Sequence, residues 1–205
     1  LQGSALNKRV LNSIKKVRYV IANSNFTKNL AIEIGISKDK IEVIHPGLSD
    51  PVEIKGIFQK KADEIYRDSF PKILTVARLD RRKNHQNILM CIRNLTEKFP
   101  KIRYISIGDG EEKNNLLKLV KELKIEDRVS FFYNSEEQLK NALIKNSNLF
   151  LMPSIKYKKS VEGFGISFIE AASYGVGSIG GEYGGAKDAI KNEVTGLLCD
   201  GENID

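Results

Sequence analysis

Two glutamates with seven residues between them are the side chains in this chain whose types and spacing best indicate chemistry. Glu162 precedes the turn Gly163-Phe164-Gly165, and Glu170 lies in an apolar run that begins at Ile166 and is typical of a helix. Glycines let a backbone approach a ligand closely. The start of a helix presents unpaired N–H groups and the positive end of a dipole. A phosphate is the natural ligand of such a turn.

The two carboxylates beside this turn indicate a second kind of ligand group. A carboxylate repels phosphate, but it accepts hydrogen bonds from hydroxyl groups. Phosphate and hydroxyls together predict a nucleotide sugar. The alternative is that Glu162 is an ordinary loop acid and Glu170 an ordinary helix-face acid, since two glutamates at this spacing often occur by chance.

The elements that must position this turn form a repeating pattern from residue 72 onward, in which six strand-like segments alternate with five helix-like ones. We expect strands at 73–77, 102–107, 129–132, 149–152, 176–179 and 196–199, and helices at 87–99, 111–123, 136–145, 166–174 and 185–191. The pattern predicts an α/β fold with a Rossmann-like, doubly wound parallel sheet. Such sheets bind ligands at the carboxyl ends of their strands, so the residues after each strand are site candidates.

The loop after the first of these strands is crowded with cations. Four of the six residues from Arg78 to Lys83 are Arg or Lys. Such a loop is either simply solvated or a binding site for an anion, because Arg offers a planar fork of donors and Lys a point charge. The residue after Lys83 is Asn84, and His85 next to it is expected to start a helix rather than to act as a catalyst.

Three other loops contribute weaker candidates. Gly108 belongs to a Gly-Asp-Gly turn, which is little evidence by itself. Tyr133 and Asn134 follow the third strand, and Tyr133 either stacks on a base or packs in the core. Gly184 and Gly185 precede the last short helix.

The N-terminal part of the chain has a strand–helix–strand pattern of its own, with strands at 18–22 and 40–44 that are expected to pair in parallel. We divide the chain into residues 1–47, a polar linker or variable insertion at 48–70, and the repeating domain at 71–205. The chain starts without Met and stops just after a strand-like segment. We therefore expect a piece of a longer protein.

Composition excludes several classes of function. With 41% hydrophobic and 29% charged residues, the 205-residue chain is typical of a soluble globular protein. Its net charge of +7 suits nucleic acid, an anionic membrane or an anionic substrate, but it has neither a zinc spacing nor an aromatic-basic RNA motif, which argues against nucleic acid. Cys91 and Cys199 share no motif spacing, which favours a reducing cytoplasm. The lysines at 156, 158 and 159 are either solvated or face anionic lipid or an anionic acceptor.

The string from Pro153 to Ala171, which is Pro-Ser followed by Glu-x7-Glu-Ala with Gly-Phe-Gly after the first Glu, resembles the signature of glycosyltransferase family 4 (group 1), whose members are retaining enzymes of the GT-B fold. The similarity extends over residues 18–50 and 72–201. It implies that the chain is the C-terminal, donor-binding half of such an enzyme with a remnant of the N-terminal half.

The resemblance also implies roles for the candidate residues. Arg78 and Lys83 would stabilise the departing diphosphate as catalytic residues, and Glu162 would lie by the donor sugar. Glu170 would accept the ribose hydroxyls. The positions that would bind the donor are Gly108, Tyr133, Asn134, Gly163, Phe164, Gly165, Ile166, Glu170, Gly184 and Gly185. Asn84 replaces a glycine of the family pattern, which puts the shape of that loop in question.

The implied activity is transfer of a sugar, with retention, from a nucleotide-diphosphate sugar to a glycan or lipid-linked acceptor in polysaccharide or lipopolysaccharide biosynthesis. No metal or other cofactor is expected, since cations take the metal's role and there is no Asp-x-Asp motif. We expect a cytoplasmic location at the inner face of the membrane, with peripheral contact with anionic lipid and without nucleic acid. The piece alone is expected to be inactive. A noncatalytic nucleotide-binding domain and a sugar-nucleotide 2-epimerase of the same fold are alternatives, and the base, sugar and acceptor stay open.

Overall fold

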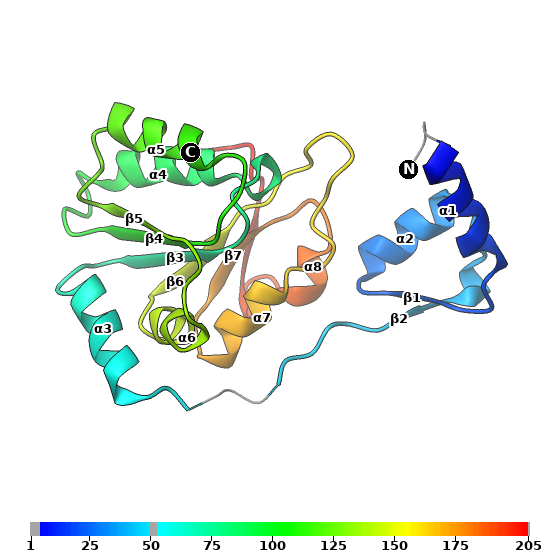
Figure 1. Cartoon of the computed structure of the whole chain (residues 1–205), viewed down its shortest axis with the longest axis horizontal. Coiled ribbons are helices and arrows are strands. Elements are labelled where there is room, and N and C mark those ends of the chain that lie inside the picture. Colours follow the sequence, from blue (N-terminus) through cyan, green and yellow to red (C-terminus); the bar gives the residue numbers. More distant parts are fainter. Residues whose placement is uncertain (1–4, 50–52, 205) are drawn as a thin grey trace.

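The computed structural model describes residues 5–49 and 53–204, which form a small N-terminal lobe and a larger C-terminal domain (Figure 1). The elements of the N-terminal lobe are α1 (Ala5–Lys16), β1 (Val20–Ala22), α2 (Asn25–Glu33), η1 (Lys38–Lys40) and β2 (Ile41–Val43). β1 and β2 pair in parallel, with Val20 opposite Ile41, which confirms the pairing predicted from the strand–helix–strand pattern. Ser24 caps α2, because its hydroxyl accepts a hydrogen bond of 3.0 Å from the backbone N–H of Thr27.

The C-terminal domain contains a six-stranded, entirely parallel sheet with the order β5-β4-β3-β6-β7-β8. Its strands are β3 (Lys72–Val76), β4 (Arg103–Ile107), β5 (Val129–Phe132), β6 (Leu149–Met152), β7 (Ser178–Gly181) and β8 (Gly196–Cys199). The chain builds outward from β3 to β5 on one side, then returns to β6 and builds outward on the other. This confirms the predicted α/β fold with a Rossmann-like, doubly wound sheet, and it places the point where the strand order reverses between β3 and β6.

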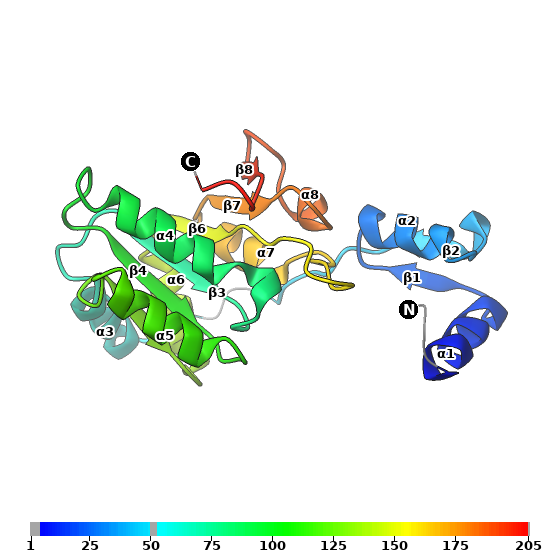
Figure 2. The ribbon, with the colours of Figure 1, turned by 90° about the horizontal axis from the view of Figure 1, so that it is seen from above.

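Helices cover both faces of the sheet (Figures 1 and 2). They are α3 (Gly56–Tyr66), η2 (Arg81–Lys83), α4 (His85–Leu95), α5 (Lys113–Glu122), α6 (Glu137–Lys145), α7 (Ile166–Ser173) and α8 (Ala186–Ala189). α4 and α5 pack on one face, and α3, α6, α7 and α8 pack on the other, so each face has its own apolar core. Within residues 5–49 and 53–204, none of the helices is long and apolar enough to cross a membrane.

The range 48–70, which we expected to be a linker or an insertion, contains a helix that belongs to the domain core. Ala62 and Tyr66 of α3 are fully buried in the same cluster as α6 and the sheet. The hydroxyl of Tyr66 donates a hydrogen bond of 3.2 Å to the backbone carbonyl of Leu143 on α6. Residues 50–52 of this range lie outside the described residues.

The largest displacement of a predicted strand is at β7, which we expected at 176–179 and which runs from Ser178 to Gly181. Two glycines occupy the end of this strand, and glycine has a low β-propensity, so the sequence did not indicate that the strand extends through them. The other strands of the sheet lie within one residue of the expected ranges.

Candidate functional site

The candidate residues converge at the carboxyl edge of the sheet, where the strand order reverses. The loop at residues 78–84, here called the cation loop, follows β3, and residues 162–166, here called the glycine turn, lie between β6 and α7. β3 and β6 are neighbours in the sheet, with Leu74 paired to Phe150, so the two segments meet although about 80 positions separate them. In doubly wound sheets this is the crevice in which ligands bind.

A buried ion pair joins the cation loop to the glycine turn. Lys83 Nζ lies 2.5 Å from Glu162 Oε2, and Arg82 Nη1 lies 2.7 Å from the same oxygen. The side chains of Lys83 and Glu162 are each 10% exposed. Ser154 Oγ lies 3.4 Å from this carboxylate and donates to it. Sequence reasoning selected Lys83 and Glu162, but not their contact with each other, and it missed Arg82.

The charges of this cluster shift both pKa values. Burial alone would raise the pKa of Glu162, but the charges and hydrogen bonds of Lys83 and Arg82 outweigh burial and hold the pKa below its ordinary value. Burial also lowers the pKa of Lys83, against the raising effect of Glu162. The partner charges outweigh burial at Glu162 because it has two cationic partners. Burial prevails at Lys83, which shares the carboxylate of Glu162 with Arg82. Glu162 is therefore an ionised group that orients Lys83.

Local backbone structure places the cations of this loop. The carboxylate of Asp80 caps the short helix η2 by accepting a hydrogen bond of 3.0 Å from the backbone N–H of Lys83. Arg82 then points toward Glu162, while Arg81 points the other way, toward Glu112. Arg78 is the most solvent-exposed of these cations: its side chain is 74% exposed and lies 3.7 Å from Glu111. Arg78 is therefore free to turn toward a ligand.

Asn84 resolves the question raised by the missing glycine. Its backbone is left-handed, with φ of 60°, which is the conformation that glycine adopts most easily and that Asn tolerates better than most residues. Its side-chain amide donates to the backbone carbonyls of Pro153 (3.2 Å) and Gly201 (2.5 Å). Asn84 thus keeps the loop shape and ties it to the segment after β6.

His85 starts α4, as expected, and is 2% exposed. Its Nε2 lies 3.2 Å from the carbonyl oxygen of Arg78, and its Nδ1 lies 3.1 Å from the hydroxyl of Tyr104. Burial lowers its pKa to about 4, so the ring is neutral at neutral pH and one of its nitrogens accepts. With Nε2 protonated, His85 donates to the Arg78 carbonyl and fixes the start of the cation loop.

This buried histidine makes stability depend on pH. Its folded-state pKa of about 4 lies below the ordinary value of 6.5, so between these values the unfolded chain binds a proton that the folded chain does not. The stability that comes from keeping His85 buried and neutral is fully present above pH 6.5 and is lost as the pH falls toward 4. We expect the wild type to lose about 2 kcal/mol more between pH 7.5 and 5 than a His85→Gln variant. Urea unfolding at both pH values measures this, and equal losses would contradict it.

The glycine turn is shaped by close backbone approaches. Gly165 caps α7 with φ of 93°, and a Cβ there would lie 2.5 Å from the ring of Phe168. Phe164 is buried, and Ile166, at the first position of α7, is 48% exposed. The backbone N–H of Gly185 donates to the carbonyl of Glu162 at 2.8 Å, and Gly184 forms an isolated parallel β-bridge with Glu162. Both predicted glycine pairs therefore lie at the same turn.

Glu170 lies one turn further along α7 and also has a cationic partner. Lys140 Nζ of α6 lies 2.9 Å from Glu170 Oε1 and 2.9 Å from Glu137 Oε1. Burial alone would lower the pKa of Lys140, but its two carboxylate partners outweigh burial and raise it. Sequence reasoning missed Lys140, which reads as an ordinary helix-face lysine 30 positions from Glu170.

The remaining predicted donor contacts follow β4 and β5 at the carboxyl edge of the sheet. Gly108 has φ of 142°, and a Cβ there would lie 2.0 Å from the carbonyl oxygen of Ala77, so only glycine lets the ends of β3 and β4 come this close. Tyr133 packs with its ring parallel to Phe131, and Lys113 Nζ lies 3.5 Å from the Tyr133 ring centre. The Tyr133 ring therefore packs against the protein, and Asn134 beside it is exposed.

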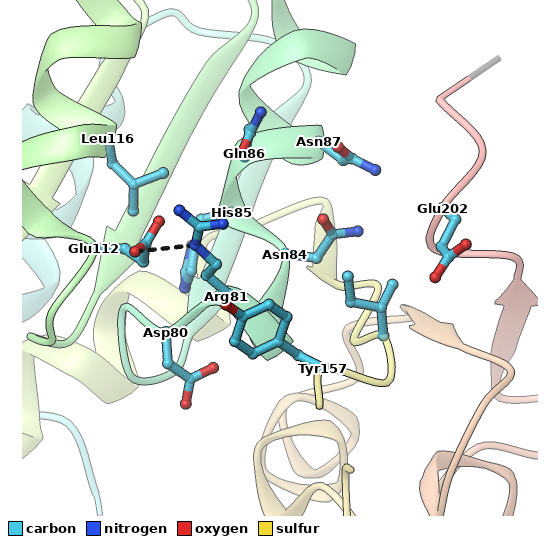
Figure 3. A pocket seen from close by; sticks show the side chains of 11 residues that line it. Asp80, Arg81, Asn84, His85, Gln86, Asn87, Glu112, Leu116, Tyr157 and Glu202 are labelled. Atoms are coloured by element: carbon cyan, nitrogen blue, oxygen red, sulfur yellow. Dashed lines mark hydrogen bonds and ion pairs between the residues drawn. The ribbon is translucent and has the colours of Figure 1, made fainter. Parts of the chain in front are cut away.

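A cavity of about 250 Å³ lies beside the cation loop, next to Arg81 and Tyr157 (Figure 3). Arg81 extends across it, with Nε 3.4 Å from Glu112 Oε1 and the guanidinium carbon 5.8 Å from the Tyr157 ring centre. Its other lining residues include Asn84, His85 and Glu202, and none of the predicted site residues lines it. Arg81 therefore points toward this cavity, whereas Arg82 points toward Glu162.

The N-terminal lobe contacts the C-terminal domain at the glycine turn. Thr27 Oγ1 donates to the carbonyl of Gly163 at 3.4 Å, and the ring of His45 lies 5.4 Å from that of Phe164. The carboxylate of Asp188 on α8 accepts a hydrogen bond from the backbone N–H of Asn25, at the start of α2, and lies 3.5 Å from His45 Nε2.

The sequence model of the family described as glycosyl transferases group 1 matches residues 57–205, which is most of the chain. The chain belongs to this family. The N-acetyl-alpha-D-glucosaminyl L-malate synthase of Bacillus anthracis is 28% identical to this group 1 glycosyltransferase chain over 197 residues, which cover 96% of the chain and 50% of that protein.

A GDP-mannose-dependent alpha-(1-6)-phosphatidylinositol monomannoside mannosyltransferase of Mycobacterium tuberculosis is 28% identical over 137 residues, which cover 66% of the chain and 36% of that protein. The crystal structure of HepE of Anabaena in complex with UDP and glucose superimposes with a TM-score of 0.81 at 22% identity, over 97% of this chain and 54% of that one. The fold therefore matches one half of a GT-B glycosyltransferase. The chain spans about half the length, or less, of the curated relatives it matches.

Proposed function

We propose that the crevice between the cation loop and the glycine turn binds the diphosphate of a nucleotide-sugar donor, as the donor half of a retaining glycosyltransferase. The observation that carries this proposal is the buried contact of Lys83 and Arg82 with Glu162, which holds two loops together at the reversal point of the sheet. Membership of the group 1 family supports it. So does the UDP bound to HepE, a structural neighbour with the same fold.

In this proposal the protein acts on the leaving group. When the bond between the anomeric carbon and the diphosphate breaks, negative charge builds on the diphosphate oxygens. Lys83, the exposed Arg78 and the N–H groups at the start of α7 would stabilise that charge. Preorganised charges and dipoles of this kind often contribute more to the rate of an enzyme than any other single effect. Glu162 would orient Lys83 and meet the donor sugar.

Glu170 would bind the ribose through its carboxylate, which can accept hydrogen bonds from two neighbouring hydroxyls. Lys140 would hold that carboxylate in place, because the two side chains already touch. We propose uracil or guanine as the base, because HepE is seen in complex with UDP and the mycobacterial relative is GDP-mannose-dependent. Tyr133 and Asn134 lie at the proposed base end of the crevice.

The wider setting is part of the same proposal. We place the protein in polysaccharide or lipopolysaccharide biosynthesis in the cytoplasm, at the inner face of the membrane, with a glycan or lipid-linked acceptor. A relative named as acting on a phosphatidylinositol monomannoside supports a lipid-linked acceptor. Because the chain spans about half the length of its relatives, we propose that it binds donor weakly and does not transfer sugar by itself.

Calorimetric titration of the chain with UDP, GDP and ADP tests the proposal. We expect one diphosphate to bind best, and we expect Arg78→Ala and Glu170→Ala each to weaken it about tenfold, since each removes a charged hydrogen-bonding partner. Two variants on the outer helices, Arg93→Ala and Glu122→Ala, are matched controls and should bind as the wild type does. Equal binding of all three nucleotides, unchanged in the two site variants, would contradict the proposal.

A further inference from the structure

A large basic cavity opens at the amino edge of the sheet, on the opposite edge from the proposed donor site. It has a volume of about 710 Å³ and lies between the end of α3 and the residues that lead into β3, β4 and β5. In Figure 1 this is the end of the sheet that carries α3, away from the N-terminal lobe. The cationic residues that line it are Lys61, Arg67, Lys101, Arg103 and Arg128. A cavity of this size accommodates a small-molecule group.

The positive charge of this cavity is only partly balanced. Its carboxylates are those of Glu64, Asp68 and Asp127, so five cations face three anions and two positive charges are left. Asp68 is taken by Lys101, at 2.5 Å, and Asp127 by Arg128, at 3.0 Å.

The remaining three cations of the cavity are not held in ion pairs within the described part of the chain. Within residues 5–49 and 53–204, neither Lys61 nor Arg67 nor Arg103 forms an ion pair with a carboxylate. Any anion that enters the cavity meets these three side chains without having to displace a carboxylate from them.

Arg103 is built into the wall of the cavity and keeps unused donors. Its Nη1 donates to the backbone carbonyl of Asp127 at 2.8 Å, and its Nη2 donates to Ser130 Oγ at 2.7 Å. Its Nε is buried and has no hydrogen-bond partner among the described residues. A buried donor without a partner is costly, so this one indicates a missing acceptor.

Arg67, which lines the same cavity as Arg103, has a strained backbone. Its φ of 47° and ψ of −132° form a combination that residues other than glycine rarely adopt, and such strain often marks a functional position. Burial lowers the pKa of Arg103, Asp127 and Tyr66 raise it in part, and the positive charge of Arg67 adds a smaller lowering effect. Two guanidinium groups that repel each other in one cavity are the arrangement that an oxyanion between them would stabilise.

We propose that this amino-edge cavity is a second anion site, which binds a phosphate group through Arg67 and Arg103. Arginine forks match the geometry of phosphate oxygens, and the net charge of +2 on the lining side chains matches the charge of a phosphate monoester. The phosphate belongs to a free small molecule or to the headgroup of an anionic lipid. The site is independent of the donor crevice, because none of its residues lies in the cation loop or the glycine turn.

Arg67→Gly is the decisive variant, because glycine adopts the backbone conformation of Arg67 without strain. The variant is therefore expected to fold at least as well as the wild type while it loses one of the two guanidiniums. Lys118→Ala is the matched control, since it removes one exposed cation from α5, outside the cavity. Arg103→Lys keeps the charge but removes the fork, and tests the donor geometry separately.

Inorganic phosphate is the first probe, titrated at constant ionic strength while backbone amide signals are followed by NMR. We expect saturable shifts at residues 67–69 and 101–103 in the wild type and in Lys118→Ala, and at least fivefold weaker binding in Arg67→Gly and Arg103→Lys. Binding at the donor site would instead shift the amide signals of residues 163–166. The two sets of signals therefore test the two proposals separately, so that one can fail while the other holds.

The second probe is a phosphatidylcholine vesicle with about one third phosphatidylglycerol, compared with pure phosphatidylcholine. Sedimentation with the anionic vesicles that is lost in Arg67→Gly, without saturable phosphate binding, assigns the phosphate to a lipid headgroup. Saturable phosphate binding without sedimentation assigns it to a free small molecule. If neither probe distinguishes Arg67→Gly from Lys118→Ala, the proposal is wrong.

Discussion

A Lys83→Met variant should lose about 2–4 kcal/mol of unfolding free energy and most of its affinity for a nucleoside diphosphate. Removing one partner of a buried ion pair leaves the other buried and uncompensated. The cost here should fall below the upper end of the usual range, because Arg82 remains 2.7 Å from Glu162. Urea unfolding and calorimetric titration of the same preparations measure both effects.

Two further variants serve as controls for the Lys83→Met variant. Lys118→Met places the same substitution on an exposed lysine of α5 and should leave stability within about 0.5 kcal/mol of the wild type. The double variant Lys83→Met/Glu162→Met removes both charges, so it should regain part of the lost stability but not the binding. If the single variant binds the diphosphate as the wild type does, Lys83 has no role at the donor.

A Gly185→Ala variant should lose about 2 kcal/mol or more, and its affinity for the diphosphate should fall at least tenfold. The backbone of Gly185 is not itself strained, but a Cβ there would lie 1.9 Å from the carbonyl oxygen of Gly163. Because the obstructing atom belongs to the backbone, the glycine turn must move, and overpacking of this kind costs roughly 1–3 kcal/mol or more.

Gly177→Ala is the matched control for this variant. A Cβ at Gly177 would meet no atom within 4 Å, so its stability should stay within about 0.5 kcal/mol of the wild type. The same unfolding and titration measurements apply. Wild-type binding by Gly185→Ala would show that the position of the glycine turn does not control the site.

The sheet could be predicted from the sequence because buried parallel strands read as short apolar runs between turn residues. The helix α3 was missed, although it carries core residues. Its inward face consists of Phe58, Ala62, Ile65 and Tyr66, which stand at helical spacing. The polar and charged residues around them made the segment read as a linker, and Ile57, which belongs to the apolar spacing seen in the sequence, is 71% exposed.

The site also contains residues that the sequence indicated and residues that it did not. Motif spacing selected Glu162, Glu170 and Lys83, since each lies at a fixed place after a strand or on a helix. Their partners depend on which strands are neighbours and on how loops turn. Arg82 reaches Glu162 and Arg81 does not, although both are arginines of one short helix. The cap at Asp80 and the left-handed backbone at Asn84 fix the ends of this short helix, and with them the directions in which its cations point.

The contacts of the N-terminal lobe with the glycine turn would couple the orientation of the lobes to donor binding. Thr27 donates a hydrogen bond to the carbonyl of Gly163, which belongs to the glycine turn of the proposed donor site. Any preference of the donor for one lobe orientation must, by thermodynamic linkage, be matched by an equal effect of that orientation on donor affinity. Asp188 contacts both His45 and the start of α2, so a substitution there that weakens the contact between the lobes would also change how tightly the donor is held.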